Sequence, residues 1–370
     1  MNKQYLTFAP YRSGLCNVIM CYEMAFALAH ITNRTIIIPP TTYLTHITSH
    51  GPKEDWGDIF YIFDFYEAKK LFDIVDIRDH EEFKPFLDKI GSWNSWTVNI
   101  TDRVKDIFCW KKSPATGPYN LTDDGICFVN DPNRYNNEDF VNFISGRRII
   151  DVNKTEKYLH FENNLFQHYW YLTYAGGPKE RNELKRKINK TFRYNNKFYN
   201  SVLEAVTISD YNAVHIRRGP PNDFLFQFGY SLNTVNTSEK LANEIDKLFP
   251  ADLPLYIASD ESDRSFFDIL KRKYKIYFFE DFFQNQSKLE TAVLEQIICS
   301  RANIFVGTAN STYSKRIQVM RGIDGLPATD YMGINDIVDN YEIDSPYPWA
   351  YRDYKRWSWN SSSYIQWRME

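Results

Sequence analysis

The segment YLTFAPYRSGLCNVIMCYEMAFALAHITNRTIIIPP, residues 5–40, indicates the fold class of the chain. Its start, YLTFAP, is typical of a strand, and YRSGLCN (11–17) is typical of a loop. In VIMCYEMAFALAHIT (18–32), apolar side chains recur in steps of three and four, which predicts a helix with one apolar face. The β-branched run TIIIPP (35–40) predicts a buried strand closed by prolines. Strand, helix and parallel strand form a βαβ unit, so we expect an α/β fold.

A second alternation of strands and helices begins with AVHIRR at residue 213. The predicted strands are 213–218, 253–260, 275–280 and 303–308, and the predicted helices are 238–249, 261–272, 289–302 and 310–322. This rhythm predicts a second, mostly parallel sheet with helices on its faces.

The length of 370 residues suits two domains. We expect an N-terminal domain over 1–205, a C-terminal domain over 206–335, and an aromatic-rich tail over 336–370 that packs back on the body. Residues 41–135 lack a clear period and are interpreted as insertions around the first sheet. Other predicted elements are helices at 138–145, 178–192 and 197–210 and a strand at 157–163.

The composition is that of a globular protein, with 43% hydrophobic and 25% charged residues. The net charge of −3 gives no basic field for nucleic acid or an anionic membrane. Aromatic residues reach 17%, which fits carbohydrate or base stacking, although core filling is the simpler explanation for most of the rings.

The five cysteines show neither metal spacing nor a disulfide framework. We expect reduced thiols, with a Cys109–Cys127 disulfide as the alternative in an exported protein. The N-terminus does not resemble a signal peptide, and no run approaches the roughly 20 apolar residues of a membrane helix. The expectation is a cytoplasmic protein without a membrane span, and the Golgi or ER lumen is the alternative.

Three predicted strand ends in the second half carry polar residues: HIRRG, YIASDE and FVGTANSTYS. Ligands bind beyond the carboxyl ends of the strands in an open parallel sheet. In the first motif, His215 and Arg217 share one face of the strand, and Arg218 follows where the chain leaves the sheet. A strand-end guanidinium suits an anionic ligand, because it donates two aligned hydrogen bonds and stays charged. A salt bridge between domains is the alternative.

The other two motifs offer a carboxylate and a helix start. Asp260 can accept hydrogen bonds from the N1–H and amino groups of guanine, or it can simply cap the helix that follows. Gly307 permits close backbone approach, and the amide groups that open the next helix, with the hydroxyls of Ser311 and Thr312, suit a phosphate. An N-cap role explains the two hydroxyl residues but not the glycine. We expect Arg217 and this helix start to meet over a diphosphate.

Several nucleotide-binding patterns are missing from the sequence. It has no Walker A loop and no G-x-G-x-x-G, which argues against an ATPase or a dehydrogenase. It also lacks the D-x-D pair that usually holds the cation of metal-dependent sugar-nucleotide enzymes. We therefore expect Arg217 and the helix start, rather than Mg²⁺, to carry the charge of a leaving diphosphate.

Four stretches, in order, resemble the GDP-fucose fucosyltransferase superfamily, which includes protein O-fucosyltransferases and α1,6 and α1,2 enzymes. They are the segment 5–40 with its NRT-x-x-x-P strand, HIRRG, YIASDE, and EQIICSRANIFVGTANSTYSKRI. The resemblance spans residues 5–40 and 213–322. It implies a GT-B architecture, in which two Rossmann-like domains flank a cleft, GDP-fucose as the donor, inversion at the anomeric carbon, and no metal or other cofactor.

The resemblance also implies roles for individual residues. Arg217 would bind the β-phosphate and assist departure of GDP, while His215 and Asp260 would contact the nucleoside. The remaining positions implied in donor binding are Gly14, Asn17, Arg218, Gly307, Ser311 and Thr312. The chain departs from relatives with H-x-R-R-x-D, because Pro220 stands where they have an acid, and its first loop differs from their G-x-G-x-N-Q-like form.

The acceptor is expected to be a carbohydrate or glycoprotein hydroxyl. Asp223 is the candidate general base, because α1,6 relatives carry a carboxylate slightly further along the same loop, and a solvated loop acid is the alternative. Two other functions remain open: a GT-B transferase that uses GDP-rhamnose or a UDP-sugar, and a catalytically silent glycan-binding module.

Overall fold

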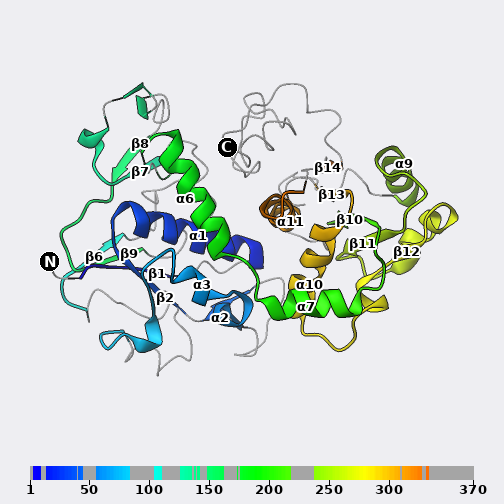
Figure 1. Cartoon of the computed structure of the whole chain (residues 1–370), viewed down its shortest axis with the longest axis horizontal. Helices are drawn as coiled ribbons and strands as arrows, with labels where there is room; N and C mark the ends of the chain where they lie inside the picture. Colours follow the sequence, from blue (N-terminus) through cyan, green and yellow to red (C-terminus); the bar gives the residue numbers. More distant parts are fainter. Residues whose placement is uncertain are drawn as a thin grey trace. The chain divides into compact units, whose positions relative to one another are not determined.

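The computed structural model divides into two compact units, Met1–Asn195 (unit 1) and Asn196–Glu370 (unit 2), whose elements are shown in Figure 1. The structure describes residues 3–9, 14–39, 41–44, 56–83, 104–110, 126–135, 137–138, 140–141, 148–161, 173, 176–217, 237–308, 311–326 and 331–332. Helix α7 (Asn196–Ala205) belongs to unit 2, where it packs on α10 (Lys288–Arg301). The predicted tail at 336–370 and most of the predicted helix at 138–145 lie outside the described residues.

Unit 1 is built on a five-stranded sheet in the order β5–β2–β1–β9–β6, and all neighbouring strands are parallel. Its strands are β5 (Ile74–Asp76), β2 (Thr35–Ile38), β1 (Tyr5–Phe8), β9 (Tyr158–Phe161) and β6 (Ile107–Trp110). The predicted βαβ unit is confirmed, since helix α1 (Leu15–Ile31) joins the parallel strands β1 and β2.

Two features of unit 1 differ from the sequence prediction. The stretch 41–135 supplies two strands of the main sheet, β5 and β6, and is more than a set of insertions around it. Helix α1 is buried all round, with only Asn17 and His30 less than fully covered, whereas one apolar face was expected. A helix that is apolar on all sides can be covered on all sides, and α1 contacts both β1 and helix α6 (Pro178–Thr191).

Unit 1 also contains several smaller elements. They are β3 (Thr41–Tyr43), β4 (Trp56–Asp58), α2 (Ile59–Ile62), α3 (Phe65–Ala68), η2 (Ile77–Asp79), β7 (Ile126–Val129), η4 (Pro132–Arg134) and β8 (Arg148–Asp151). Strands β3 and β4 pair antiparallel, and β7 and β8 pair parallel.

The motif Asn33-Arg34 has a structural explanation in unit 1. Asn33 has a positive φ of 51° just after α1, a conformation that asparagine tolerates at helix ends. The buried guanidinium of Arg34 then donates to main-chain carbonyls of Lys154, Glu156 and Lys157, which precede β9, and of Tyr5 in β1. This side chain thus ties the entrances of two neighbouring strands together.

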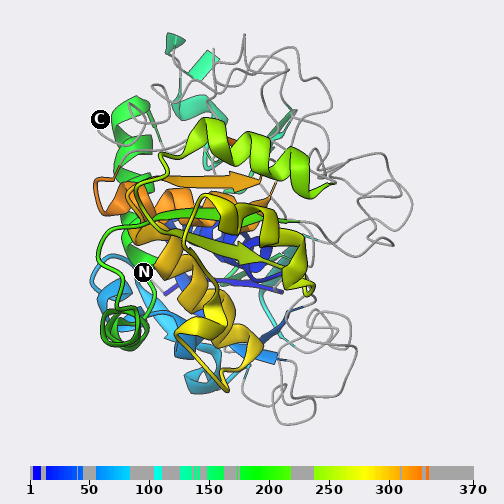
Figure 2. The same ribbon diagram turned by 90° about the vertical axis from the view of Figure 1, so that its right-hand side faces the viewer.

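Unit 2 contains a second five-stranded sheet in the order β12–β11–β10–β13–β14, again parallel throughout. Its strands are β12 (Ile276–Tyr277), β11 (Leu255–Ser259), β10 (Asn212–Ile216), β13 (Phe305–Thr308) and β14 (Tyr331–Met332). Its helices, besides α7 and α10, are α9 (Ser238–Leu248), η6 (Arg264–Arg272), η7 (Phe279–Asp281) and α11 (Thr312–Ile323), and they can be followed with the strands in Figure 2.

Alternation along β10 sends its side chains to two different layers. Val214 and Ile216 lie in a core cluster with Leu241 and Ile245 of α9 and Phe267 of η6. His215 points to the opposite side, where it contacts α11. The central strand therefore carries apolar side chains on one face and a polar side chain at its end on the other.

Two predicted elements of unit 2 are modified by caps. The predicted helix at 261–272 is a 3₁₀ helix that begins at Arg264. Asp263 is its N-cap, and the Asp263 carboxylate accepts hydrogen bonds from the N–H and Oγ–H of Ser265. The predicted strand at 275–280 is limited to β12, because the Asp281 carboxylate accepts from the N–H of Phe278 and η7 begins there.

Among the described residues, no helix has both the length and the apolar character that a membrane crossing requires. Cys16, Cys21, Cys109 and Cys299 are thiols rather than half-cystines.

A buried arginine fixes the entrance to β13. The Arg321 guanidinium, 0% exposed, donates to the main-chain carbonyls of Ser300, Ala302 and Asn303, which end α10 and lead into β13. Hydrogen bonds from a charged donor are stronger than neutral ones. The guanidinium therefore satisfies carbonyls that the end of α10 leaves without helical partners.

We expect Arg321→Met to lower the free energy of unfolding by about 3 kcal/mol, because several buried carbonyls lose a charged donor at once. Arg301→Met removes an exposed arginine from the end of the same helix and should change stability by less than about 0.5 kcal/mol. Urea unfolding of both variants measures the difference. Equal losses in the two variants would contradict this account of Arg321.

Candidate functional site

The three strand ends singled out in the sequence lie side by side at the carboxyl edge of the unit 2 sheet. Ile216 at the end of β10 is in register with Ser259 at the end of β11. On the other side of β10, Val214 pairs with Val306 of β13. The polar residues that follow these strands therefore leave the sheet at one edge, where parallel sheets bind ligands.

Arg217 and Asp260, from neighbouring strands, form an ion pair. Nη1 of Arg217 lies 3.2 Å from Oδ2 of Asp260, and the side chains are 23% and 29% exposed. Both side chains are thus mostly buried but still partly accessible to solvent. The sequence predicted that these two residues serve one site, and the structure brings them together.

His215 is buried and held on two sides by helix α11. Its Nδ1 lies 2.6 Å from Oγ of Ser314, and its ring lies 4.6 Å from the ring of Tyr313. Burial lowers the pKa of His215 to about 3, with Asp260 opposing this shift and Arg217 adding to it. The imidazole is therefore neutral at neutral pH and can act as a hydrogen-bonding group but not as a cation.

Helix α11 begins at the same edge. Ser311 is its N-cap and accepts a hydrogen bond from the Ser314 N–H at 3.4 Å, and Thr312 is its first residue. The capping role that was the alternative for Ser311 is thus present, yet its hydroxyl hydrogen stays able to donate. The main-chain amides of the first turn make such a helix start suitable for an anion. Gly307 lies within β13, in register with Tyr331 of β14, and not in a turn.

The other predicted site residues are placed elsewhere or not described. Gly14 is the N-cap of α1 in unit 1, with φ −61° and ψ 155°, and Asn17 lies in the first turn of that helix. Arg218 and Asp223 lie outside the described residues.

Three hydroxyl residues at the edge of unit 2 were missed by sequence reasoning. Oγ1 of Thr308 accepts from the Arg217 N–H at 2.9 Å and donates to the His215 carbonyl at 2.8 Å. Oγ of Ser259 donates to the Ile216 carbonyl at 2.8 Å, and Ser314 contacts His215. Only Ser314 had a usable signal, because its position three residues after Ser311 places both on one face of a helix.

The described residues contain no group of three His, Cys, Asp or Glu side chains that could hold a metal ion. What the site does offer is one guanidinium, a helix start, several hydroxyl and amide donors, and a carboxylate. This combination suits a ligand that joins an anionic part to a part with hydrogen-bond donors.

Comparison with known proteins identifies relatives of the chain. The family model described as GDP-fucose protein O-fucosyltransferase matches residues 5–324. The chain is also 29% identical over 120 residues to GDP-fucose protein O-fucosyltransferase 2 of Caenorhabditis elegans. That alignment covers 32% of this chain and 27% of the relative, so the chain spans only about a quarter of the length of that protein.

Solved structures share the fold. The crystal structure of POFUT1 in complex with GDP superposes with a TM-score of 0.53 at 14% identity, over 90% of this chain and 99% of that chain. The crystal structure of POFUT1 in complex with GDP-fucose gives a TM-score of 0.51, also at 14% identity, over 90% and 99% of the two chains. The predicted fold class, α/β with GT-B architecture, is confirmed by this likeness.

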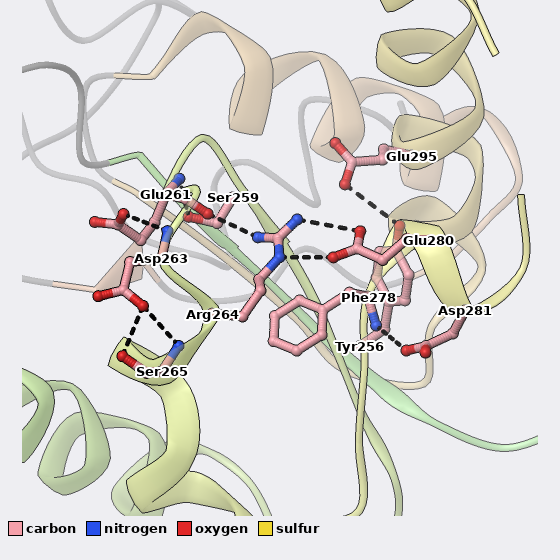
Figure 3. Close-up of polar contacts among 10 residues, drawn as sticks. All are labelled: Tyr256, Ser259, Glu261, Asp263, Arg264, Ser265, Phe278, Glu280, Asp281 and Glu295. Carbon is pink, nitrogen blue, oxygen red and sulfur yellow. Dashed lines mark hydrogen bonds and ion pairs between the residues drawn. The ribbon is translucent and has the colours of Figure 1, made fainter. Parts of the chain in front are cut away.

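The carboxyl group of Glu295 lies beside Tyr256 (Figure 3), and it also contacts Tyr313, whose ring lies against His215. Oε1 and Oε2 of Glu295, on α10, lie 3.4 Å from the hydroxyl oxygens of Tyr256 and Tyr313. Glu295 is half-buried in surface area, but its carboxyl group is densely surrounded by protein. Burial raises the pKa of Glu295 to about 8, although Arg264 and the two tyrosine hydroxyls act in the opposite direction. Glu295 is therefore mostly protonated at neutral pH.

We expect Glu295 to make stability depend on pH. The pKa of its carboxyl group rises from 4.5 in the unfolded chain to about 8 in the folded protein. Between these values the folded protein holds a proton that the unfolded chain has released, so stability from this group falls as pH rises through that window. Glu295→Gln should abolish this fall, which amounts to roughly 3 kcal/mol between pH 5 and pH 8. Urea unfolding at pH 5, 6.5 and 8 measures it.

The matched control is Glu204→Gln, at an exposed position in α7. It should keep the pH profile of the wild type. The pH dependence that His215 contributes has the opposite sign, because stability from this group is lost as pH falls below 6.5. Both variants keep His215, so its contribution cancels when their profiles are compared. A Glu295→Gln profile parallel to that of the wild type would rule out the protonated carboxyl.

Proposed function

Since this chain belongs to the GDP-fucose protein O-fucosyltransferase family, we propose that it transfers fucose from GDP-fucose to a hydroxyl group of a glycan or protein acceptor. The observation that carries the proposal is that Arg217, Asp260 and the start of α11 lie together at the carboxyl ends of the strands of unit 2. A guanosine diphosphate needs a cation and amide donors for its phosphates and an acceptor for the guanine edge. These groups stand together here.

Each side chain takes a role that follows from its chemistry. Arg217 binds the β-phosphate, and Asp260 accepts hydrogen bonds from the N1–H and amino groups of guanine. The two side chains pair with each other at 3.2 Å, so GDP binding would exchange this ion pair for contacts of Arg217 with phosphate and of Asp260 with guanine. The first-turn amides of α11, with Ser311 and Thr312, bind phosphate oxygens. His215, being neutral, contributes a hydrogen bond to the nucleoside without adding charge.

The proposed reaction is a single displacement with inversion at C1 of fucose. The acceptor oxygen forms a bond to C1 as the bond from C1 to the diphosphate oxygen breaks. Negative charge grows on the leaving diphosphate, where Arg217 and the helix start are already oriented. Preorganised donors stabilise the transition state most at such a point. We propose that they take the place of a metal ion in neutralising GDP. Gly14, Asn17 and Arg218 complete the donor site in this proposal, and Asp223 is the candidate base for the acceptor hydroxyl.

One test of the proposed function concerns the choice of nucleotide. GDP should raise the melting temperature of the protein and UDP should not, because uracil offers only one ring N–H to Asp260. Asp260→Asn should weaken GDP binding by roughly 10- to 100-fold, because a neutral amide replaces the charged carboxylate that accepts hydrogen bonds from guanine. Asp268→Asn, which breaks an exposed ion pair with Lys271, is the control. Titration calorimetry gives the dissociation constants. Equal stabilisation by GDP and UDP would favour a transferase that uses another nucleotide sugar.

Another test of the proposed function concerns turnover. Arg217→Ala should lower kcat for fucose transfer by on the order of 10²- to 10³-fold at saturating donor, because it removes a preorganised donor. Arg217→Lys should recover only part of this loss, because an ammonium lacks the planar fork. Arg272→Ala removes an exposed arginine at the end of η6 and should leave kcat unchanged.

The assay is release of GDP together with labelled product, with GDP-fucose and a panel of glycan and glycoprotein acceptors, in the presence and absence of EDTA. Transfer that persists in EDTA supports the metal-independent mechanism, and transfer that EDTA abolishes contradicts it. Binding of a glycan without any release of GDP would point instead to a silent binding module.

A further inference from the structure

Thr308 contacts both parts of the proposed diphosphate site, namely Arg217 and the start of α11. Its hydroxyl accepts a hydrogen bond from the Arg217 N–H at 2.9 Å and donates one to the His215 carbonyl at 2.8 Å. Its own carbonyl accepts from the N–H of Ser311, the N-cap of α11, at 3.3 Å. One residue, 6% exposed, thus contacts both the main chain that carries the guanidinium and the residue that begins the helix.

These contacts begin where the main-chain pairing between β10 and β13 ends. The register between β10 and β13 is Ala213 to Phe305 and Val214 to Val306, and it does not extend further. Beyond that point the Thr308 side chain connects the two strands in place of main-chain pairing. On the other side of β10, Ser259 bonds to the Ile216 carbonyl at 2.8 Å. The main chain of residues 215–217 is therefore held by a hydroxyl from each flanking strand.

The geometry points to Thr308 as a positioning residue for Arg217: its hydroxyl sets where the guanidinium stands relative to the start of α11, and hence to a diphosphate held between them. The inference rests on the proposed function, since it concerns how the same donor site is shaped. Thr308 itself acts through the main chain of residues 215–217, from which the Arg217 side chain extends. A hydroxyl is required because the position uses a donor and an acceptor at once, which no apolar side chain of the same shape supplies.

The test compares variants that differ only in this hydroxyl. Thr308→Val keeps the branched shape and removes both hydrogen bonds, whereas Thr308→Ser keeps the hydroxyl. Thr191→Val is the matched control: Thr191 is also buried, at 0% exposed, and its hydroxyl donates to the Lys187 carbonyl at 2.9 Å within α6 of unit 1. The measurements are kcat, KM for GDP-fucose and the dissociation constant of GDP.

We expect Thr308→Val to lower kcat by roughly 10- to 100-fold, the scale on which small displacements of a catalytic group act. KM for GDP-fucose should change less than kcat, because the charge on the diphosphate is largest in the transition state. Thr308→Ser should restore most of the activity, and Thr191→Val should keep wild-type kcat. If Thr308→Val does not fold, Thr308→Ala removes the same hydroxyl with a smaller side chain.

A double-mutant cycle with Arg217→Ala separates positioning from general damage to the fold. Because Thr308 acts through Arg217, Thr308→Val should cost little further activity in an Arg217→Ala background. The inference is overturned if a folded hydroxyl-free variant retains wild-type kcat, or if its loss is as large without Arg217 as with it. A wild-type protein that neither binds GDP nor releases it would instead overturn the proposed function. If the wild type is active and Thr308→Val has the same kcat, the positioning role is contradicted but the proposed function is not.

Discussion

Parallel pairing of β10 with β11 and β13 is the constraint on which the candidate site depends. Because the three strands run in one direction, the residues that follow them emerge at one edge, although they are far apart in sequence. The apolar face of β10 is fixed by the core that it shares with α9 and η6. Its other face must then present His215 to α11, and the next residue on that face, Arg217, reaches the edge beside Asp260.

The elements that sequence could predict are those with a strong period or a strong stop signal. The βαβ unit of 5–40 and the strands around HIRRG, YIASDE and FVGT were of this kind, and the structure confirms them. Strands β5 and β6 were missed because runs as short as Ile74–Asp76 and Ile107–Trp110 gain their stability from a sheet neighbour, not from their own sequence. Helix α1 was predicted to have one apolar face. Its sequence has almost no polar face, and the structure covers the helix on all sides.

For the site, residue chemistry predicted the charged partners but not their supports. Arginine, aspartate and a helix start are recognisable from sequence because their chemistry suits an anion or a nucleobase, although each also has a structural alternative. Thr308, Ser259 and Ser314 are ordinary residues whose importance comes from contacts 43 to 99 positions away along the chain. Only the folded arrangement shows that their hydroxyls bond to the main chain or side chains of residues 215–217.

The neutrality of the groups beneath the sheet edge has a consequence for the field at its surface. His215 is uncharged because burial lowers its pKa, and Glu295 is largely uncharged because burial raises its pKa. Neither group therefore adds a fixed charge of its own to the ion pair of Arg217 and Asp260. An anion at this end of the sheet therefore meets two fixed charges of opposite sign, so its attraction to the guanidinium is reduced by Asp260 unless another group of the ligand engages that carboxylate.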